Sequence, residues 1–172
     1  MFEKFGEFDS AEEINRAAAA QLAEGDHEAV RGIAAENGLD PEDAEDYIAG
    51  DLQELCNTKL AALGKLKVEE SDLKPQEIME DWTAYIRYEV MENPDLASAV
   101  RKKGKSLRGC IALLLAWSFR NAKEVEKPIV QEAAKTCKEI NTLGHGRAFL
   151  GIPGIRTSRK LILEYYLGGK EK

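Results

Sequence analysis

The tripeptide Gly104-Lys105-Ser106 ends like the phosphate-binding P-loop, whose full pattern is G-x-x-x-x-G-K-[ST]. The first glycine of that pattern falls at position 99, where this chain has alanine. A P-loop also follows a hydrophobic strand, whereas residues 93–100, NPDLASAV, have the composition of a helix. Without that glycine and that strand, the backbone amides cannot wrap around phosphates. The tripeptide therefore predicts no ATP or GTP site.

Acidic side chains crowd a second segment, at Glu42, Asp43, Glu45, Asp46 and Asp51. General acid–base catalysis needs two carboxylates in different environments, one buried and one exposed, and this run is polar throughout. It also lacks the spacing of an EF-hand calcium loop. We interpret these five residues as a surface that binds a basic groove. The alternative is a solvated helix face without a partner.

Cysteine and histidine do not form a predicted metal site or a catalytic group. The three cysteines, Cys56, Cys110 and Cys137, are far apart in the chain and include no C-x-x-C pair, so we expect reduced thiols. His27 and His145 are 118 positions apart, and His145 lies between glycines, which favours a loop residue over a catalytic base. No G-x-S-x-G or H-E-x-x-H motif occurs. We expect a protein that is not an enzyme and needs no cofactor.

Basic residues gather in two clusters in the C-terminal half. The first consists of Arg101, Lys102, Lys103, Lys105 and Arg108, and the second consists of Arg156, Arg159 and Lys160. The second set has the i, i+3, i+4 spacing of one helical face. Because helix N-termini disfavour cations, basic residues placed there suggest an anion supplied from outside. That anion is nucleic acid, an acidic partner or the acidic N-terminal half of this protein; the alternative is an exposed, solvated turn.

Charge is divided unevenly along the 172 residues, whose formal net charge is −7. Residues 1–58 hold 16 acidic and three basic residues, whereas residues 101–172 hold six acidic and 16 basic residues. No lysine or arginine occurs between Arg31 and Lys59. Such asymmetry is typical of a protein that associates through electrostatic attraction.

Helix signals recur along most of the chain and predict an all-α fold. Ser10 and Glu13 form a capping box, Asp26 can cap a second helix, and Asp40 followed by Pro41 opens a third. The expected helices cover residues 10–24, 26–37, 40–49, 52–67, 75–93, 94–100, 106–122, 128–140 and 157–167, with a linker at 68–74 and one short strand within 147–152. We expect an acidic helical module at 1–70 and a basic helical bundle at 75–172, or one continuous domain.

The longest apolar run, residues 110–117, is apolar around almost the whole helix. A helix of this kind is buried on most sides, so it is predicted to be the central core helix. Its eight residues are far fewer than the roughly 20 that a membrane span needs. The first ten residues lack the basic and apolar regions of a secretion signal. We expect a cytoplasmic protein that does not bind membranes.

Several blocks of the sequence resemble a known family. These blocks are MFEKFGEFDSAEEIN, AENGLDPEDAEDYIAGDLQELC, DLKPQEIMEDW, VRKKGKSLRGCIALLLAWSF and GIPGIRTSRKLILEYYLGG. They are similar to small proteins from phages and conjugative elements of gut Firmicutes that are associated with inhibition of Cas9, the RNA-guided nuclease of type II-A CRISPR immunity. The family overlaps the PcfK-like proteins of conjugative plasmids. The resemblance covers most of the chain and is weakest over residues 132–149.

The resemblance implies an anti-CRISPR protein of the bacterial cytoplasm that binds Cas9 or its guide RNA complex and blocks DNA recognition or cleavage. Cas9 holds nucleic acid in positively charged channels, which an acidic helical surface can occupy. The alternative is a nucleic-acid-binding accessory protein of a conjugative element, acting through the basic C-terminal half. The sequence leaves open whether the protein forms a homodimer.

Overall fold

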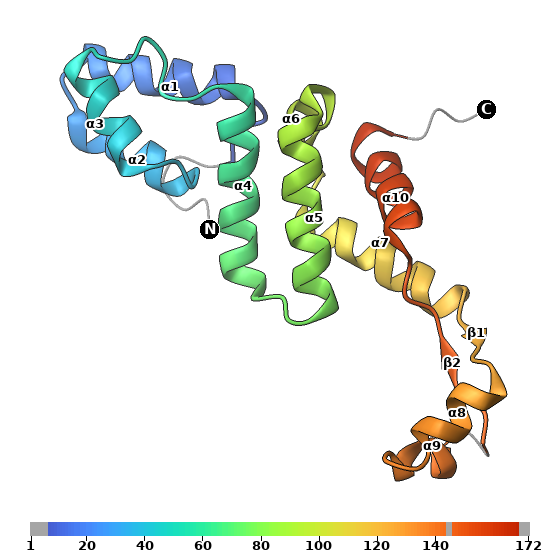
Figure 1. The fold of residues 1–172 in the computed structure, drawn as a ribbon. Coiled ribbons are helices and arrows are strands. Elements are labelled where there is room, and N and C mark those ends of the chain that lie inside the picture. The colour runs from blue at the N-terminus through green and yellow to red at the C-terminus, as the bar shows by residue number, and fades with distance from the viewer. Residues whose placement is uncertain (1–6, 144–145, 169–172) are drawn as a thin grey trace. The chain divides into compact units, whose positions relative to one another are not determined.

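The computed structural model describes residues 7–143 and 146–168, with side chains of 141–143 excluded, and this part of the chain is mostly helical (Figure 1). It contains ten helices and two strands of two residues each. The predicted all-α class is therefore confirmed. His145, interpreted above as a loop residue, lies outside the described residues. Within those residues, no helix combines the length and apolar composition that crossing a bilayer requires.

The chain divides into two compact units. The first unit comprises Met1–Ile111 together with Ile162–Lys172, and the second comprises Ala112–Leu161. The segment 70–75, where the sequence predicts a boundary between two modules, lies inside the first unit. The first unit has 27 acidic and 15 basic residues, whereas the second has four acidic and nine basic residues. Their formal net charges are thus −12 and +5.

Three short helices begin the first unit: α1 (Ala11–Ala23), α2 (His27–Glu36) and α3 (Pro41–Ala49). Each starts at the cap that the sequence predicts. The Ser10 hydroxyl accepts from the Glu13 amide at 3.2 Å, and the Asp26 carboxylate accepts from the Ala29 amide at 2.9 Å. The Asp40 carboxylate accepts from the backbone amide of residue 42 at 3.0 Å. These bonds satisfy amides that would otherwise lack a partner at a helix start.

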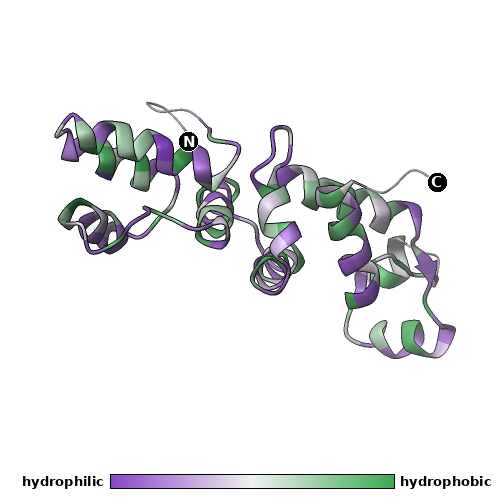
Figure 2. Cartoon of the chain, turned by 90° about the horizontal axis from the view of Figure 1, so that it is seen from above, coloured by the Kyte–Doolittle hydropathy of each residue, from purple (hydrophilic) through white to green (hydrophobic). Residues whose placement is uncertain are grey.

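The amphipathic faces of these helices meet in a shared core. Hydrophilic and hydrophobic residues alternate along the helices (Figure 2), as burying one face requires. The buried apolar residues of this core are Ala11, Ile14, Ala18, Val30, Ile33, Ala34, Leu39, Ala44, Tyr47, Leu55, Cys56 and Ala61. The core therefore joins the three helices to the start of the next one.

The next helix, α4 (Thr58–Leu73), starts later and ends later than predicted. Asn57 caps it by accepting from the Leu60 amide at 2.9 Å. The predicted linker at 68–74 is wrong, because helix continues to Leu73 and no glycine or proline interrupts it before Pro75. The helix packs closely on the end of α2: a Cβ on Gly64 would lie 2.2 Å from the Asn37 carbonyl oxygen.

Two further helices, α5 (Ile78–Glu92) and α6 (Pro94–Val100), pack against α4 (Figure 1). Asn93 separates them and caps α6 by accepting from the Asp95 amide at 3.0 Å. The predicted end of α5 before Pro94 is confirmed, as is the short helix that follows. The expected start at residue 75 is wrong, since α5 begins three residues after Pro75.

The apolar helix α7 (Leu107–Arg120) forms where predicted, but it is not the central core helix. It buries Leu107 and Leu114, whereas Leu115 and Phe119 are exposed. The prediction failed because apolar composition on all sides does not provide neighbours on all sides. One core forms between α1, α2, α3 and the start of α4, and further buried apolar residues lie on α4, α5, α6 and the first half of α7.

The second unit contains a small antiparallel ribbon between β1 (Lys123–Glu124) and β2 (Phe149–Leu150), in which Lys123 pairs with Leu150. This confirms the short strand expected within residues 147–152. The helix predicted at 128–140 is wrong, because it is interrupted at 134–137 and forms α8 (Lys127–Ala133) and α9 (Lys138–Leu143). The last helix, α10 (Ile155–Leu167), begins in the second unit and ends in the first.

Candidate partner-binding surfaces

The predicted acidic surface lies on α3 and the turn after it. Glu42, Glu45 and Asp46 follow the i, i+3, i+4 spacing of one helical face, and all three are exposed. Asp51, just after the helix, is also exposed, whereas Asp43 is half-buried at the edge of this face. We call Glu42, Glu45, Asp46 and Asp51 the acidic face.

The core holds the acidic face in place from behind. Ala44 and Tyr47 lie on the opposite side of α3 and are buried. Gly50 ends the helix with a φ of +86°, a conformation that glycine adopts without strain and other residues rarely adopt. The carboxylates are therefore displayed on a fixed helix rather than on a loose segment.

One member of the acidic face already has a cationic partner. The Arg31 guanidinium donates two hydrogen bonds to the Glu45 carboxylate, at 2.6 and 2.9 Å. This contact holds the pKa of Glu45 below its ordinary value and raises the pKa of Arg31. Both side chains are about half exposed, and such surface pairs contribute little to stability. An external cation would have to compete with Arg31 for Glu45.

Arg101 is a buried structural residue, which corrects its assignment to a basic surface. It is 1 % exposed. Its Nε donates to the Phe8 carbonyl at 3.0 Å, Nη1 to the Ala61 carbonyl at 2.8 Å and Nη2 to Asn37 Oδ1 at 2.7 Å. Burial lowers the pKa of Arg101 below its usual value, although a guanidinium remains charged at neutral pH. Because the protein itself supplies these acceptors, no external phosphate binds this side chain.

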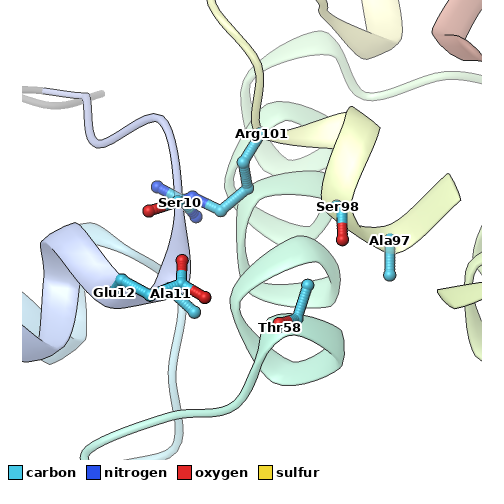
Figure 3. Close-up of a pocket in the computed structure, with 7 residues that line it drawn as sticks. All are labelled: Ser10, Ala11, Glu12, Thr58, Ala97, Ser98 and Arg101. Atoms are coloured by element: carbon cyan, nitrogen blue, oxygen red, sulfur yellow. The ribbon is translucent and has the colours of Figure 1, made fainter. Parts of the chain in front are cut away.

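A small cavity adjoins this arginine. Figure 3 shows the Arg101 side chain running from the end of α6 towards the segment that precedes α1. The cavity has a volume of about 50 Å³ and is also lined by Ser10, Thr58 and Ser98. Ligand sites usually measure about 300–1,000 Å³, so this one has room for little more than water.

The rest of the first basic cluster is distributed between solvent and the protein. Lys102, Lys103 and Arg108 are exposed. Lys105 is half-buried, donates from Nζ to the Tyr165 carbonyl, and lies 5.0 Å from the centre of the Tyr165 ring. The basic surface in this region therefore consists of three cations rather than the five predicted.

The amides at the start of α7 are already bonded within the protein. The Ser106 amide donates to the Tyr165 hydroxyl at 3.0 Å, and the Leu107 amide donates to the Glu69 carboxylate at 2.7 Å. The Gly109 amide donates to the Ser106 hydroxyl at 3.1 Å, which confirms Ser106 as the predicted cap. A P-loop needs such amides free for phosphate, so this geometry argues against a phosphate loop at residues 104–106.

A larger cavity, of about 590 Å³, also lies beside these residues. It is lined by the carboxylates Glu7, Glu69 and Asp72 as well as by the cations Lys105 and Arg108. Three carboxylates would repel a phosphate and offset the attraction of the two cations. The mixed charges therefore define no single class of ligand.

Two buried charges on α4 were not anticipated from the sequence. Lys65 is 0 % exposed, and its Nζ donates to the Glu7 carboxylate and, at 2.9 Å, to the Lys105 carbonyl. Glu69 is 6 % exposed, and burial raises its pKa although the Leu107 amide bonds it. The sequence offers one indication of their burial. Ala61, Lys65 and Glu69 follow each other at intervals of four residues, which places both charges on the same face of α4 as the buried Ala61.

The second basic cluster is accessible and belongs to the second unit. Arg156, Arg159 and Lys160 lie on α10 and are exposed. The first basic cluster belongs to the first unit.

Two of the three cysteines are buried, whereas Cys137 is half-buried. Cys56 and Cys110 are buried, and burial raises the pKa of Cys56 to about 11 and that of Cys110 to about 12. Thiols with such pKa values are poor nucleophiles at neutral pH. Among residues 7–143 and 146–168, no group of three or more His, Cys, Asp or Glu side chains could hold a metal ion.

No model of a known protein family, no curated protein and no solved structure matches this chain. What bears on function within this chain is therefore the identity and placement of its own residues.

Proposed function

We propose that this protein is a non-enzymatic anti-CRISPR inhibitor that binds Cas9 through its acidic face. The observation that carries the proposal is the exposed row of carboxylates at Glu42, Glu45, Asp46 and Asp51, which a buried core holds in place. No lysine or arginine occurs between Arg31 and Lys59, so the segment that carries these carboxylates contains no cation of its own. The resemblance of the sequence blocks to Cas9 inhibitors supports the same proposal.

The mechanism is electrostatic occupation of a nucleic-acid channel. Residues i and i+4 of a helix are about 6 Å apart along its axis, whereas one DNA strand advances about 3.4 Å per phosphate. Carboxylates at Glu42 and Asp46 thus have an axial separation close to that of phosphates two nucleotides apart. Cas9 binds nucleic acid in positively charged channels, so such a row would compete with DNA. Binding should therefore weaken as the salt concentration rises.

The test is co-elution of the protein with Cas9 in size-exclusion chromatography, with and without guide RNA, together with a DNA-cleavage assay. The test variant replaces Glu42, Asp46 and Asp51 with lysine and leaves the Arg31–Glu45 pair intact. A matched control replaces three exposed carboxylates elsewhere in the first unit, Glu24, Asp72 and Asp95, and so changes the net charge equally.

We expect the wild type and the control variant to co-elute with Cas9 and to inhibit DNA cleavage. The test variant should neither co-elute with Cas9 nor inhibit cleavage. Circular dichroism must show equal helix content in all three proteins. Full inhibition by a folded test variant would exclude the acidic face as the binding surface. Absence of any wild-type complex with Cas9 would reject the proposed function itself.

The second candidate is a nucleic-acid-binding accessory protein of a conjugative element. Exposure of Lys102, Lys103 and Arg108 beside the start of α7 favours it, because clustered cations contact backbone phosphates. The measurement is DNA and RNA affinity at several salt concentrations. Three phosphate contacts predict a slope of log K against log salt of about −2.7 for duplex DNA. No binding at low salt would eliminate this candidate.

A further inference from the structure

The second unit exposes large apolar side chains. Leu115 and Phe119 lie on one face of α7 at i and i+4, and Phe119 is 80 % exposed. Ile155, the first residue of α10, is 76 % exposed, and Ile152 just before it is half exposed. When exposed apolar side chains lie together in a large patch, the patch commonly marks an interaction site.

These four residues come from two segments that are in direct contact. A Cβ on Gly151 would lie 1.9 Å from the Ser118 carbonyl oxygen and 3.0 Å from the Ala122 Cα. The chain at residue 151 therefore crosses the end of α7 at the closest distance that only glycine permits. Ile152 follows Gly151 and Phe119 follows Ser118, so both residues adjoin the point at which the two segments touch. We call Leu115, Phe119, Ile152 and Ile155 the apolar patch.

Positive charges predominate beside the apolar patch, although Glu124 and Glu164 follow closely along the chain. Residues 112–122 and 148–161 contain Arg120, Arg156, Arg159 and Lys160, and they contain no aspartate or glutamate. Three of the four patch residues are aliphatic, and aliphatic side chains offer little to bases or phosphates. The patch therefore fits a protein surface that combines apolar side chains with carboxylates at its edges.

The first unit carries a surface of that description on α5. Ala84, Tyr88 and Met91 follow each other at i, i+4 and i+7, and all three are exposed. At 100° per residue, Glu80 lies on one side of this row, and Asp81 and Glu92, all likewise exposed, lie on the other. The opposite face of α5 is buried through Trp82, Ile86 and Val90. We call Ala84, Tyr88 and Met91 the α5 stripe.

We propose that the apolar patch of one copy of this protein binds the α5 stripe of a second copy, with its arginines against the flanking carboxylates. In a twofold-symmetric dimer this contact forms twice, because each copy supplies one patch and one stripe. A standard stable interface buries roughly 1,600 Å² over both partners, and repetition of the contact doubles the area that one patch and one stripe bury. The proposal is independent of Cas9 binding.

The test is sedimentation velocity of the full chain, without Cas9, over a range of micromolar concentrations. The expected result is a concentration-dependent species with twice the mass of the 19.1 kDa chain. Phe119→Asp and Met91→Asp should each raise the dimer dissociation constant at least 100-fold, since each places a carboxylate in an apolar contact that is used twice. Ile129→Asp, an exposed apolar position on α8 outside the patch, should leave dimerisation unchanged.

The two variants also distinguish the proposed pairing from others. A mixture of Phe119→Asp and Met91→Asp retains one intact contact, so it should form a weak heterodimer although each variant alone is monomeric. A Met91→Asp protein that dimerises like wild type would mean that the patch pairs with itself and would overturn the assignment to α5. A wild type that stays monomeric at all concentrations would overturn the proposal as a whole.

Discussion

Replacement of Arg101 should destabilise the protein strongly, although the residue belongs to a cluster that resembles a surface patch. Arg101→Met keeps most of the aliphatic stem and removes the guanidinium together with its three hydrogen bonds. Lys102→Met, at the exposed neighbouring position, removes the same formal charge without removing a buried contact. The two variants therefore separate the structural contribution from a general effect of charge.

The magnitude follows from the acceptors that lose their donor. The Ala61 carbonyl lies inside α4, where the helix itself offers a backbone donor. Removing the Arg101 donor from this carbonyl should therefore destabilise the protein least among the three acceptors. Asn37 Oδ1 belongs to a side chain that is fully buried, and the Phe8 carbonyl belongs to a half-buried residue. An unsatisfied buried acceptor costs about 1–3 kcal/mol, and hydrogen bonds to charged groups are at the upper end of the scale. We expect Arg101→Met to lower the free energy of unfolding by about 3–5 kcal/mol.

The assay is urea denaturation followed by tryptophan fluorescence in a Trp117→Phe background. Trp82, which is buried in the first unit, then reports on the unit that contains Arg101. Lys102→Met should change the free energy of unfolding by no more than about 0.5 kcal/mol, as surface substitutions usually do. A loss below about 1 kcal/mol for Arg101→Met would refute the view that this guanidinium joins the helices of the first unit.

Three further predictions concern other buried groups. Burial raises the pKa of Glu69 above its ordinary 4.5, so between these two pKa values the folded state holds a proton that the unfolded state has lost. The free energy of unfolding should therefore fall as the pH rises from 4.5 through the raised pKa. Denaturation curves of E69Q should lack this part of the pH dependence. Gly64→Ala should lower the free energy of unfolding by about 1–3 kcal/mol, because its Cβ would lie 2.2 Å from the Asn37 carbonyl oxygen. Gly154→Ala, whose Cβ meets nothing within 4 Å, should be neutral; urea denaturation followed by circular dichroism, which detects both units, compares the two variants. Titration with a thiol reagent at pH 8 should modify Cys137 quickly and the two buried cysteines only after denaturation, and three fast thiols would contradict their burial.

Helix starts were the most predictable part of the fold. The caps at Ser10, Asp26 and Asp40 act over two or three residues, so the sequence contains both the donor and the acceptor of each bond. The acidic face could be anticipated for the same reason. Its carboxylates have helical spacing, and Ala44 and Tyr47 between them supply the side of α3 that must be buried.

The course of α4 was not predictable from the same local rules. The segment 68–74 is mostly polar and by itself predicts a linker, yet it remains helical nearly to its end. Glu69 in this segment bonds the Leu107 amide, 38 residues away, and Lys65 bonds Glu7, 58 residues away. Sequence patterns that span only a few residues cannot reveal contacts between residues this far apart in the chain.

The sequence alone determined that this chain is helical, where most helices begin, and that negative and positive charge occupy different parts of it. Only the tertiary structure decided which charges face solvent. Arg101 and Lys102 are neighbours of the same chemical type, but Arg101 is buried and Lys102 is exposed, because Arg101 meets acceptors 40, 64 and 93 residues away. Burial depends on such long-range contacts, whereas the cap and spacing signals that predict a helix act within a single turn.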